Sequence, residues 1–311
     1  MILAVDVDTD ALRLALVLGA VAALVAFTTA LLWRRARPGV VGLPVAAAAL
    51  FTIRHYLSPA AAPVYIFIAA GVAFAAGEIV ARWEHPVARY LPVLGGVVLA
   101  VTPIPSVPVV ARILAALAAV VTGLALEDLD RRHASQGLGV LLLAITCAAP
   151  LFISPGSAAG PALAGAAIFT VLLLIPKPLV RVGAGGAYAV AVAFWWAVLI
   201  SAGWPQGGDN VVAGIVACGF ILFEPLARAV VQRLSGSFNR RRSTRDAVWL
   251  VVATAVVAQG ALVAYAAAVV ARTDRVDLAL LSTLPVAVGA TLVATEVVPS
   301  PRRQSRRHNS E

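Results

Sequence analysis

The sequence predicts an all-α fold, a polytopic integral membrane bundle of about eleven transmembrane helices. Hydrophobic residues make up 61% of the 311 residues, charged residues make up only 13%, and the mean hydropathy is +0.94. A soluble globular chain has roughly 25% charged residues. A chain this apolar could not cover its own surface with polar groups in water, so we expect lipid to be its main solvent.

Eleven apolar segments follow one another, separated by loops rich in turn residues or arginine, and each is expected to be a helix. They cover residues 11–33, 39–53, 63–82, 91–103, 107–126, 137–153, 159–176, 183–203, 210–231, 247–271 and 277–297. Two of them, 39–53 and 91–103, are shorter than the ~20 residues that cross a ~30 Å hydrocarbon core. We expect these two to be tilted, matched by thinner lipid or re-entrant. The segments form one transmembrane domain over 1–298, followed by a basic cytosolic tail over 299–311.

The basic residues give these helices an orientation. With the amino terminus outside, the inner loops and the tail hold 19 of the 24 basic residues. The outer five are Arg13, Arg54, Arg112, Arg272 and Arg275. This asymmetry follows the positive-inside rule, so we predict an outer amino terminus and an inner carboxyl terminus. The basic inner loops suit anionic inner-leaflet lipid, whereas no nucleic-acid partner is expected because the loops contain no folded basic module.

The amino-terminal stretch MILAVDVDTDALRLA is acidic before its first apolar run. A cleaved signal peptide needs a basic region and a small-residue cleavage site, so we expect an uncleaved first helix instead. Of the 24 basic residues only Lys177 is a lysine, which together with the abundant alanine and valine indicates high-GC coding. The expected location is the cytoplasmic (inner) membrane of a bacterium, as a multi-pass protein.

The densest group of ionisable residues is LEDLDRRHASQ, residues 126–136. Its acids Glu127, Asp128 and Asp130 raise the question of a metal or catalytic site, but a Mg²⁺-diphosphate enzyme needs carboxylates at i and i+4 and a second acidic motif elsewhere. The chain has no second cluster, and its four histidines lie at segment ends or in the tail. We interpret the stretch as a solvated cytosolic turn whose acids pair with the adjacent arginines. No metal and no cofactor is expected.

A near-repeat supplies better candidates. The stretches FAAGEIVAR and FILFEPLAR share the frame Phe-xxx-Glu-xx-Ala-Arg, which places Glu78 four residues before Arg82 and Glu224 four residues before Arg228. Residues four apart share one helix face. An unpaired carboxylate near the membrane boundary is costly, and pairing with an arginine that reaches toward water lowers that cost. These residues are therefore candidates for proton coupling or gating, with a purely structural Glu–Arg pair as the alternative.

The two stretches lie six helices apart, an offset that preserves helix direction. This allows a parallel duplication in which 11–126 corresponds to 159–297, with one helix linking them; a chance match in an alanine-rich chain is the alternative. Glu296 ends the eleventh segment and has no arginine four residues later, so it is the third acidic candidate.

Two further features stand near the eighth segment. Lys177 and Arg181 precede a glycine-rich helix start, where exposed amides could hold an anionic headgroup or a phosphate; close helix packing is the alternative. Trp195 and Trp196 fall in the same segment. Interfacial anchoring or core packing is expected for them rather than a substrate platform.

These observations favour a permease or a lipid or solute translocator of unspecified substrate, with a cavity lined by a few paired charges. One alternative is a membrane-embedded envelope-biosynthesis enzyme acting on a lipid-linked substrate, for which only the acids of 127–133 are available. The other is a non-catalytic subunit of a larger membrane complex. The sequence shows no soluble domain for ATPase chemistry, so an ion gradient or a separate subunit would supply the energy. Membrane lipids are the expected partners, and other membrane proteins or a homo-oligomer also fit.

Overall fold

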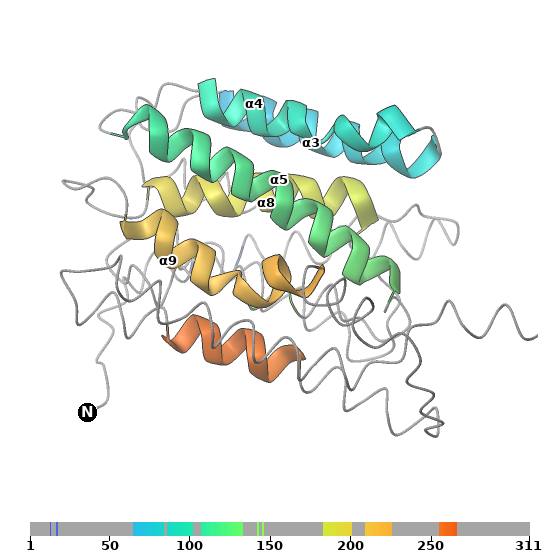
Figure 1. Cartoon of the computed structure of the whole chain (residues 1–311). Coiled ribbons are helices and arrows are strands. Elements are labelled where there is room, and N and C mark those ends of the chain that lie inside the picture. Colours follow the sequence, from blue (N-terminus) through green and yellow to red (C-terminus); the bar gives the residue numbers. More distant parts are fainter. Residues whose placement is uncertain are drawn as a thin grey trace, which may run out of the picture.

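The described part of the chain is all helical (Figure 1). The computed structural model describes Arg13, Val17, Leu142, Ile145 and the ranges 65–83, 86–101, 107–132, 183–200, 209–225 and 255–265. Its elements are α3 (Tyr65–Arg82), the 3₁₀ helix η1 (Pro86–Tyr90), α4 (Val93–Val101), α5 (Val109–Arg132), α8 (Gly183–Ile200) and α9 (Asp209–Ala217). Beyond a turn at residue 218 the helix continues over 219–225, and a further helix covers Ala255–Tyr265. No strand occurs within these ranges.

Helices α3, α4 and α5 pack side by side in chain order, and glycines allow the close approach. A Cβ atom added at Gly95 of α4 would lie 2.7 Å from the Cβ atom of Ala73 in α3. On the other side of α4, a Cβ atom at Gly96 would lie 2.6 Å from Cγ2 of Val120 in α5. Both distances are shorter than an ordinary contact between carbon atoms. The absence of a side chain at these two glycines therefore allows the backbone of α4 to lie close to both α3 and α5.

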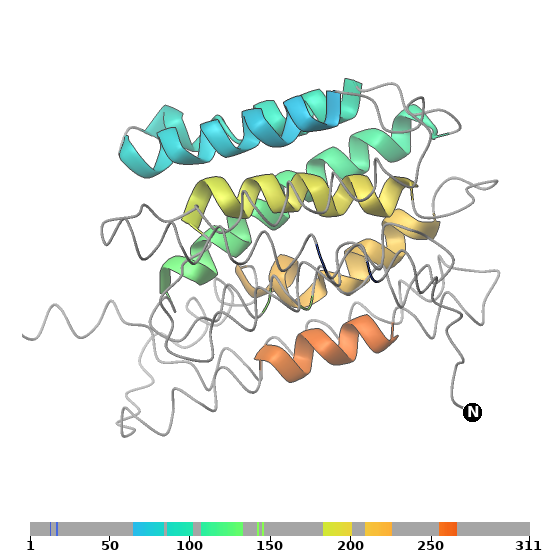
Figure 2. The ribbon, with the colours of Figure 1, turned by 180° about the vertical axis from the view of Figure 1, so that it is seen from behind.

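Helix α8 is the centre of the described bundle. It contacts α3, α5 and α9, and it lies between them in both views (Figures 1 and 2). Every residue of α8 whose side chain is described is buried. Its sequence GAGGAYAVAVAFWWAVLI is apolar on all sides, the pattern of a helix surrounded by protein.

The aromatic residues of α8 belong to the core. Phe194, Trp195 and Trp196 are fully buried, and the rings of Phe194 and Trp195 meet edge to face with centroids 5.5 Å apart. The core-packing alternative for the two tryptophans is therefore confirmed, and interfacial anchoring is wrong for them. Neighbouring helices cover their rings: Gly214 of α9 lies against Trp195, since a Cβ atom there would meet the indole at 2.8 Å.

The helices alternate in direction. Gly77, near the end of α3, and Asp130, near the end of α5, both lie at the start of α8, which therefore runs opposite to both. Gly214, in the first half of the helical stretch 209–225, packs against Trp195 and Val198 toward the end of α8, and this stretch turns back again. As a result the ends of α3 and α5 and the beginning of α8 share one end of the bundle.

Six of the expected segments contain described helices: 63–82, 91–103, 107–126, 183–203, 210–231 and 247–271. Within segment 91–103, α4 has only nine residues, a length of about 14 Å. The boundary expected at residue 126 is wrong, because α5 continues to Arg132. Apart from the four isolated residues named above, segments 11–33, 39–53, 137–153, 159–176 and 277–297 and the tail 299–311 lie outside the described residues.

Candidate functional site

Asp130 of α5 caps the amino terminus of α8. The backbone N–H of Gly183 donates a hydrogen bond of 3.0 Å to Oδ2 of Asp130, whose side chain is only 3% exposed. Gly183 has a φ of 64°, a conformation that a residue with a Cβ atom adopts only with strain. The bond satisfies one of the amides that a helix start leaves without an intrahelical acceptor, and it places a carboxylate at the positive end of the helix dipole.

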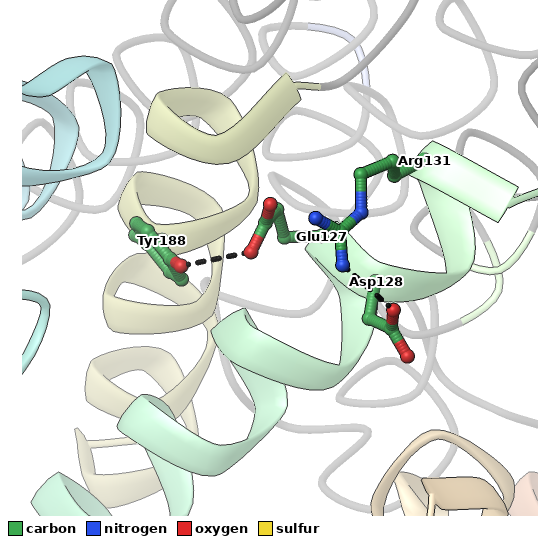
Figure 3. Close-up of polar contacts among 4 residues, drawn as sticks. All are labelled: Glu127, Asp128, Arg131 and Tyr188. Atoms are coloured by element: carbon green, nitrogen blue, oxygen red, sulfur yellow. Dashed lines mark hydrogen bonds and ion pairs between the residues drawn. The ribbon is translucent and has the colours of Figure 1, made fainter. Parts of the chain in front are cut away.

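Glu127 lies one helical turn before Asp130 and faces the same helix. Its Oε2 atom accepts a hydrogen bond of 3.1 Å from the hydroxyl of Tyr188 in α8 (Figure 3). Asp128 instead forms a 3.2 Å ion pair with Arg131, whose side chain is exposed. Figure 3 shows the division: Glu127 points to α8, while Asp128 and Arg131 pair along α5. Glu127 and Asp130 therefore hold α5 against α8, whereas Asp128 and Arg131 lie on the more exposed side of the helix.

The interpretation of the stretch as a turn is wrong for residues 126–132, which are helical; residues 133–136 of the same stretch lie outside the described residues. The segment is the last part of α5, and Leu129 and Asp130 are buried in it. The expected local pairing is confirmed for Asp128 and Arg131. Three acids in four residues end an apolar run, and this pattern predicts a turn. Two of those acids instead accept hydrogen bonds from α8, and these bonds keep the end of α5 helical and packed.

Glu78 reaches the same end of α8 from α3. Helices α3 and α8 touch at backbone distance, since a Cβ atom at Gly77 would lie 2.5 Å from the Cα and N atoms of Gly185. A Cβ atom at Gly185 would in turn lie 2.9 Å from Oε1 of Glu78. The half-buried Glu78 carboxylate therefore lies against the first turn of α8. Arg82, one turn further along α3, is exposed.

Glu224 is the second acid of the near-repeat, and it is 1% exposed. Backbone bonds from Cys218 to Gly214 and from Leu222 to Cys218 carry the helix through the turn at residue 218. Ten residues separate Glu224 from Gly214, a rise of about 15 Å, and ten residues separate Trp195 from Gly185. Because Gly214 packs beside Trp195, Glu224 lies at about the depth of Gly185, so this buried carboxylate belongs to the same level of the bundle as Glu78.

The structure thus brings together Glu78, Glu127 and Asp130 around the first two turns of α8, with Glu224 at the same depth. We call these four residues the carboxylate layer. Among the other residues expected from the sequence, Lys177, Arg181, Arg228 and Glu296 lie outside the described residues. For the glycine-rich start of α8, close packing is confirmed, and Asp130 accepts from its first amide.

Sequence reasoning set aside Glu127 and Asp130. The signal that could have retained them is their spacing of three residues, which places both on one face of a helix and separates them from Asp128 and Arg131. A second polar contact lies deeper in the same interface, where Nε1 of Trp195 donates a 3.0 Å bond to Oγ1 of Thr122. Among the described residues no group of three or more His, Cys, Asp and Glu side chains is arranged to hold a metal ion.

Helix α5 is long and apolar enough to cross a membrane by length and composition, over Val109–Arg131. Core helices of soluble proteins also have such lengths and compositions, so this finding does not by itself place the chain in a membrane. No protein-family model matches the sequence, and no curated protein matches it.

Proposed function

We propose that the chain is a polytopic membrane permease or a lipid or solute translocator, and that Glu78 and Glu224 of the carboxylate layer couple its movement to protons. One observation carries the proposal: the half-buried carboxylate of Glu78 lies against the amino-terminal turn of the central helix, at a crossing where α3 and α8 touch at backbone distance. A group placed there can change its charge at the contact between two helices. A transport cycle requires helices to separate and close again, and a change of charge at such a contact can control that movement.

The membrane location is supported by the outer surface of the described helices. Exposed apolar side chains lie along the whole of α4 and along the first half of α5, as far as Val121. The residues are Val93, Leu94, Val97, Val101, Val109, Val110, Ile113, Leu114, Leu117 and Val121. A continuous apolar face of this kind suits lipid rather than water. The alternating helix directions also agree with the parity that an eleven-helix topology requires of segments three, four, five, eight and nine.

The proposed mechanism follows from charge and burial. An ionised Glu78 is attracted by the positive end of the α8 dipole, which favours the closed contact between α3 and α8. A proton neutralises the carboxylate and removes that attraction, which weakens the contact between the two helices. The contact then separates at lower cost, and loss of the proton on the other side of the cycle restores it. Glu224 is the second acid at this depth and takes part in the same exchange.

Glu127 and Asp130 have a different role in this proposal. Each accepts a hydrogen bond from α8, so each holds the helix rather than carrying the proton. The same bonds are the reason that we prefer transport to an enzyme that would use the acids of 127–133. Asp128 instead pairs with exposed Arg131 along α5. Asp128 therefore serves as the matched control for substitutions in the layer.

The test uses purified protein in liposomes that contain a pH-sensitive dye and carry an imposed pH gradient. Sugars, amino acids, organic anions and inorganic cations are added by class, and a transported solute changes the rate at which the gradient decays. Glu78→Gln should abolish the solute-dependent change, whereas Asp128→Asn should leave it as in the wild type. Unchanged coupling in Glu78→Gln would remove Glu78 from the mechanism. Wild-type protein with no solute-dependent proton movement in any class would refute proton-coupled transport.

A further inference from the structure

The connection between α3 and α4 exposes large apolar and aromatic side chains at the end of the bundle. Trp83 is 66% exposed, Val87 62% and Tyr90 72%. Arg82, directly before Trp83, is also exposed. Three such side chains in eight residues would be poorly hydrated on a surface in water. Tryptophan and tyrosine are instead enriched where a membrane meets water, because their rings are apolar with one polar edge.

The 3₁₀ helix η1 has two distinct sides. In a 3₁₀ helix residues three apart lie above one another, so Val87 and Tyr90 project on one side. Ala88 projects elsewhere and is buried, 3% exposed. The backbone of η1 is tied to α4 by bonds from Leu91 to Ala88 and from Leu94 to Leu91. The exposed side chains are therefore held outward by a folded element that is continuous with the bundle.

The depth of η1 follows from helix geometry. Gly95 packs beside Ala73, which lies nine residues, or about 14 Å, before Arg82 on α3. The five residues from Gly95 back to Tyr90 cover roughly 8 to 10 Å. Tyr90 thus lies within about one helical turn of the level of Arg82. The exposed apolar face of α4 begins immediately beyond it, at Val93.

We propose that Arg82, Trp83, Val87 and Tyr90 form an interfacial anchor, which lies in the headgroup layer and binds anionic phospholipid. The inference rests on the membrane location proposed above. The aromatic rings occupy the boundary between headgroups and acyl chains, and the acyl chains continue along the apolar face of α4. The exposed Arg82 guanidinium attracts phosphate and anionic headgroups.

The occupant is a lipid rather than a protein because the charge and the aromatic residues are arranged by depth. Aromatic side chains and arginine lie together at one end, and aliphatic side chains alone follow on α4. A bilayer has this order of layers, whereas a docked protein would have no reason to match it.

The test places one fluorescent label at a time on a background in which Cys147 and Cys218 are replaced by alanine. Val87→Cys reports on the anchor and leaves Arg82 and both aromatic side chains in place. Val97→Cys, an exposed valine on α4, is the matched reference for the apolar face. The labelled protein is placed in vesicles of phosphatidylcholine and phosphatidylglycerol that contain lipids spin-labelled either at the headgroup or deep in the acyl chain.

The label at residue 87 should be quenched more by headgroup spin labels than by deep ones, and the label at residue 97 should show the reverse. If residue 97 is quenched by deep labels while residue 87 responds only to aqueous iodide, the anchor is refuted and the membrane location stands. If neither position responds to any lipid spin label, the membrane location fails and the anchor fails with it.

The preference for anionic lipid has its own readout. Headgroup-labelled phosphatidylglycerol should quench the label at residue 87 more than headgroup-labelled phosphatidylcholine does at equal content. Arg82→Gln should reduce this preference and Arg82→Lys should retain it, because a charge and not a particular geometry attracts the headgroup. Equal quenching by the two lipids in the wild type would refute the anionic specificity.

Discussion

Replacing Gly77 by alanine should separate α3 from α8 and destabilise the bundle. The added Cβ atom would lie 2.5 Å from the Cα and N atoms of Gly185, where ordinary contact begins about 1 Å further out. Those are backbone atoms, so no side-chain rotation can relieve the overlap and the helices themselves must move. Gly71, in the same helix, is the matched control because no atom lies within 4 Å of its Cβ position.

The magnitude follows from two opposing effects. Overpacking a tight contact costs about 1–3 kcal/mol, and a backbone overlap belongs at the upper end of that range. Alanine returns about 1 kcal/mol through its higher helix propensity. We therefore expect Gly77→Ala to lower the free energy of unfolding by about 2 kcal/mol. Gly71→Ala should raise it by up to about 1 kcal/mol, which makes a difference of about 3 kcal/mol between the two variants.

Cys218 supplies the assay because it is fully buried. In a Cys147→Ala background, protein in mild detergent is heated with a maleimide dye that becomes fluorescent on reacting with the thiol. Exposure of Cys218 then marks unfolding, and the expected difference in Tm between the two variants is about 6 °C or more. Equal Tm values for Gly77→Ala and Gly71→Ala would refute the backbone contact between α3 and α8, and with it the position assigned to Glu78.

Two further substitutions test the polar contacts of α8 by the same thiol assay. Asp130→Ala leaves the N–H of Gly183 without its acceptor and should cost about 1–2 kcal/mol, whereas Asp130→Asn keeps an oxygen in place and should recover most of the loss; equal losses would contradict the cap. Thr122→Val preserves shape but removes the acceptor of the Trp195 indole, so it should cost about 1–3 kcal/mol. The same substitution should cost much less in a Trp195→Phe background, and an undiminished cost there would show that the bond is not its cause.

Much of the described fold could be predicted from local sequence. The position and length of an apolar run predict where a helix lies. Helices α3 and α8 begin and end within two or three residues of the expected segments 63–82 and 183–203. The glycine-rich start of α8 also pointed to close packing. These features depend on residues that are neighbours in the chain, so the sequence displays them directly.

The end of α5 shows what local sequence does not contain. A run of acids after an apolar segment usually marks the point where a helix meets water. Here the donors for Asp130 and Glu127 are Gly183 and Tyr188, more than fifty residues later. The carboxylate layer therefore depends on how distant helices pack. For the two members of the layer on α5, Glu127 and Asp130, the sequence showed only that they are three residues apart.

The central position of α8 also has a consequence for the order of assembly. Helices α3, α4 and α5 are consecutive and pack on one another, so they can associate as soon as they are synthesised. Asp130 must wait 53 residues for the amide of Gly183. Until then the two α5 carboxylates that later bind α8 lack their donors on that helix. The three-helix unit that forms first therefore carries two carboxylates without their hydrogen-bond donors on α8. When α8 packs against this unit, it fills the core and supplies those donors, which removes the free-energy cost.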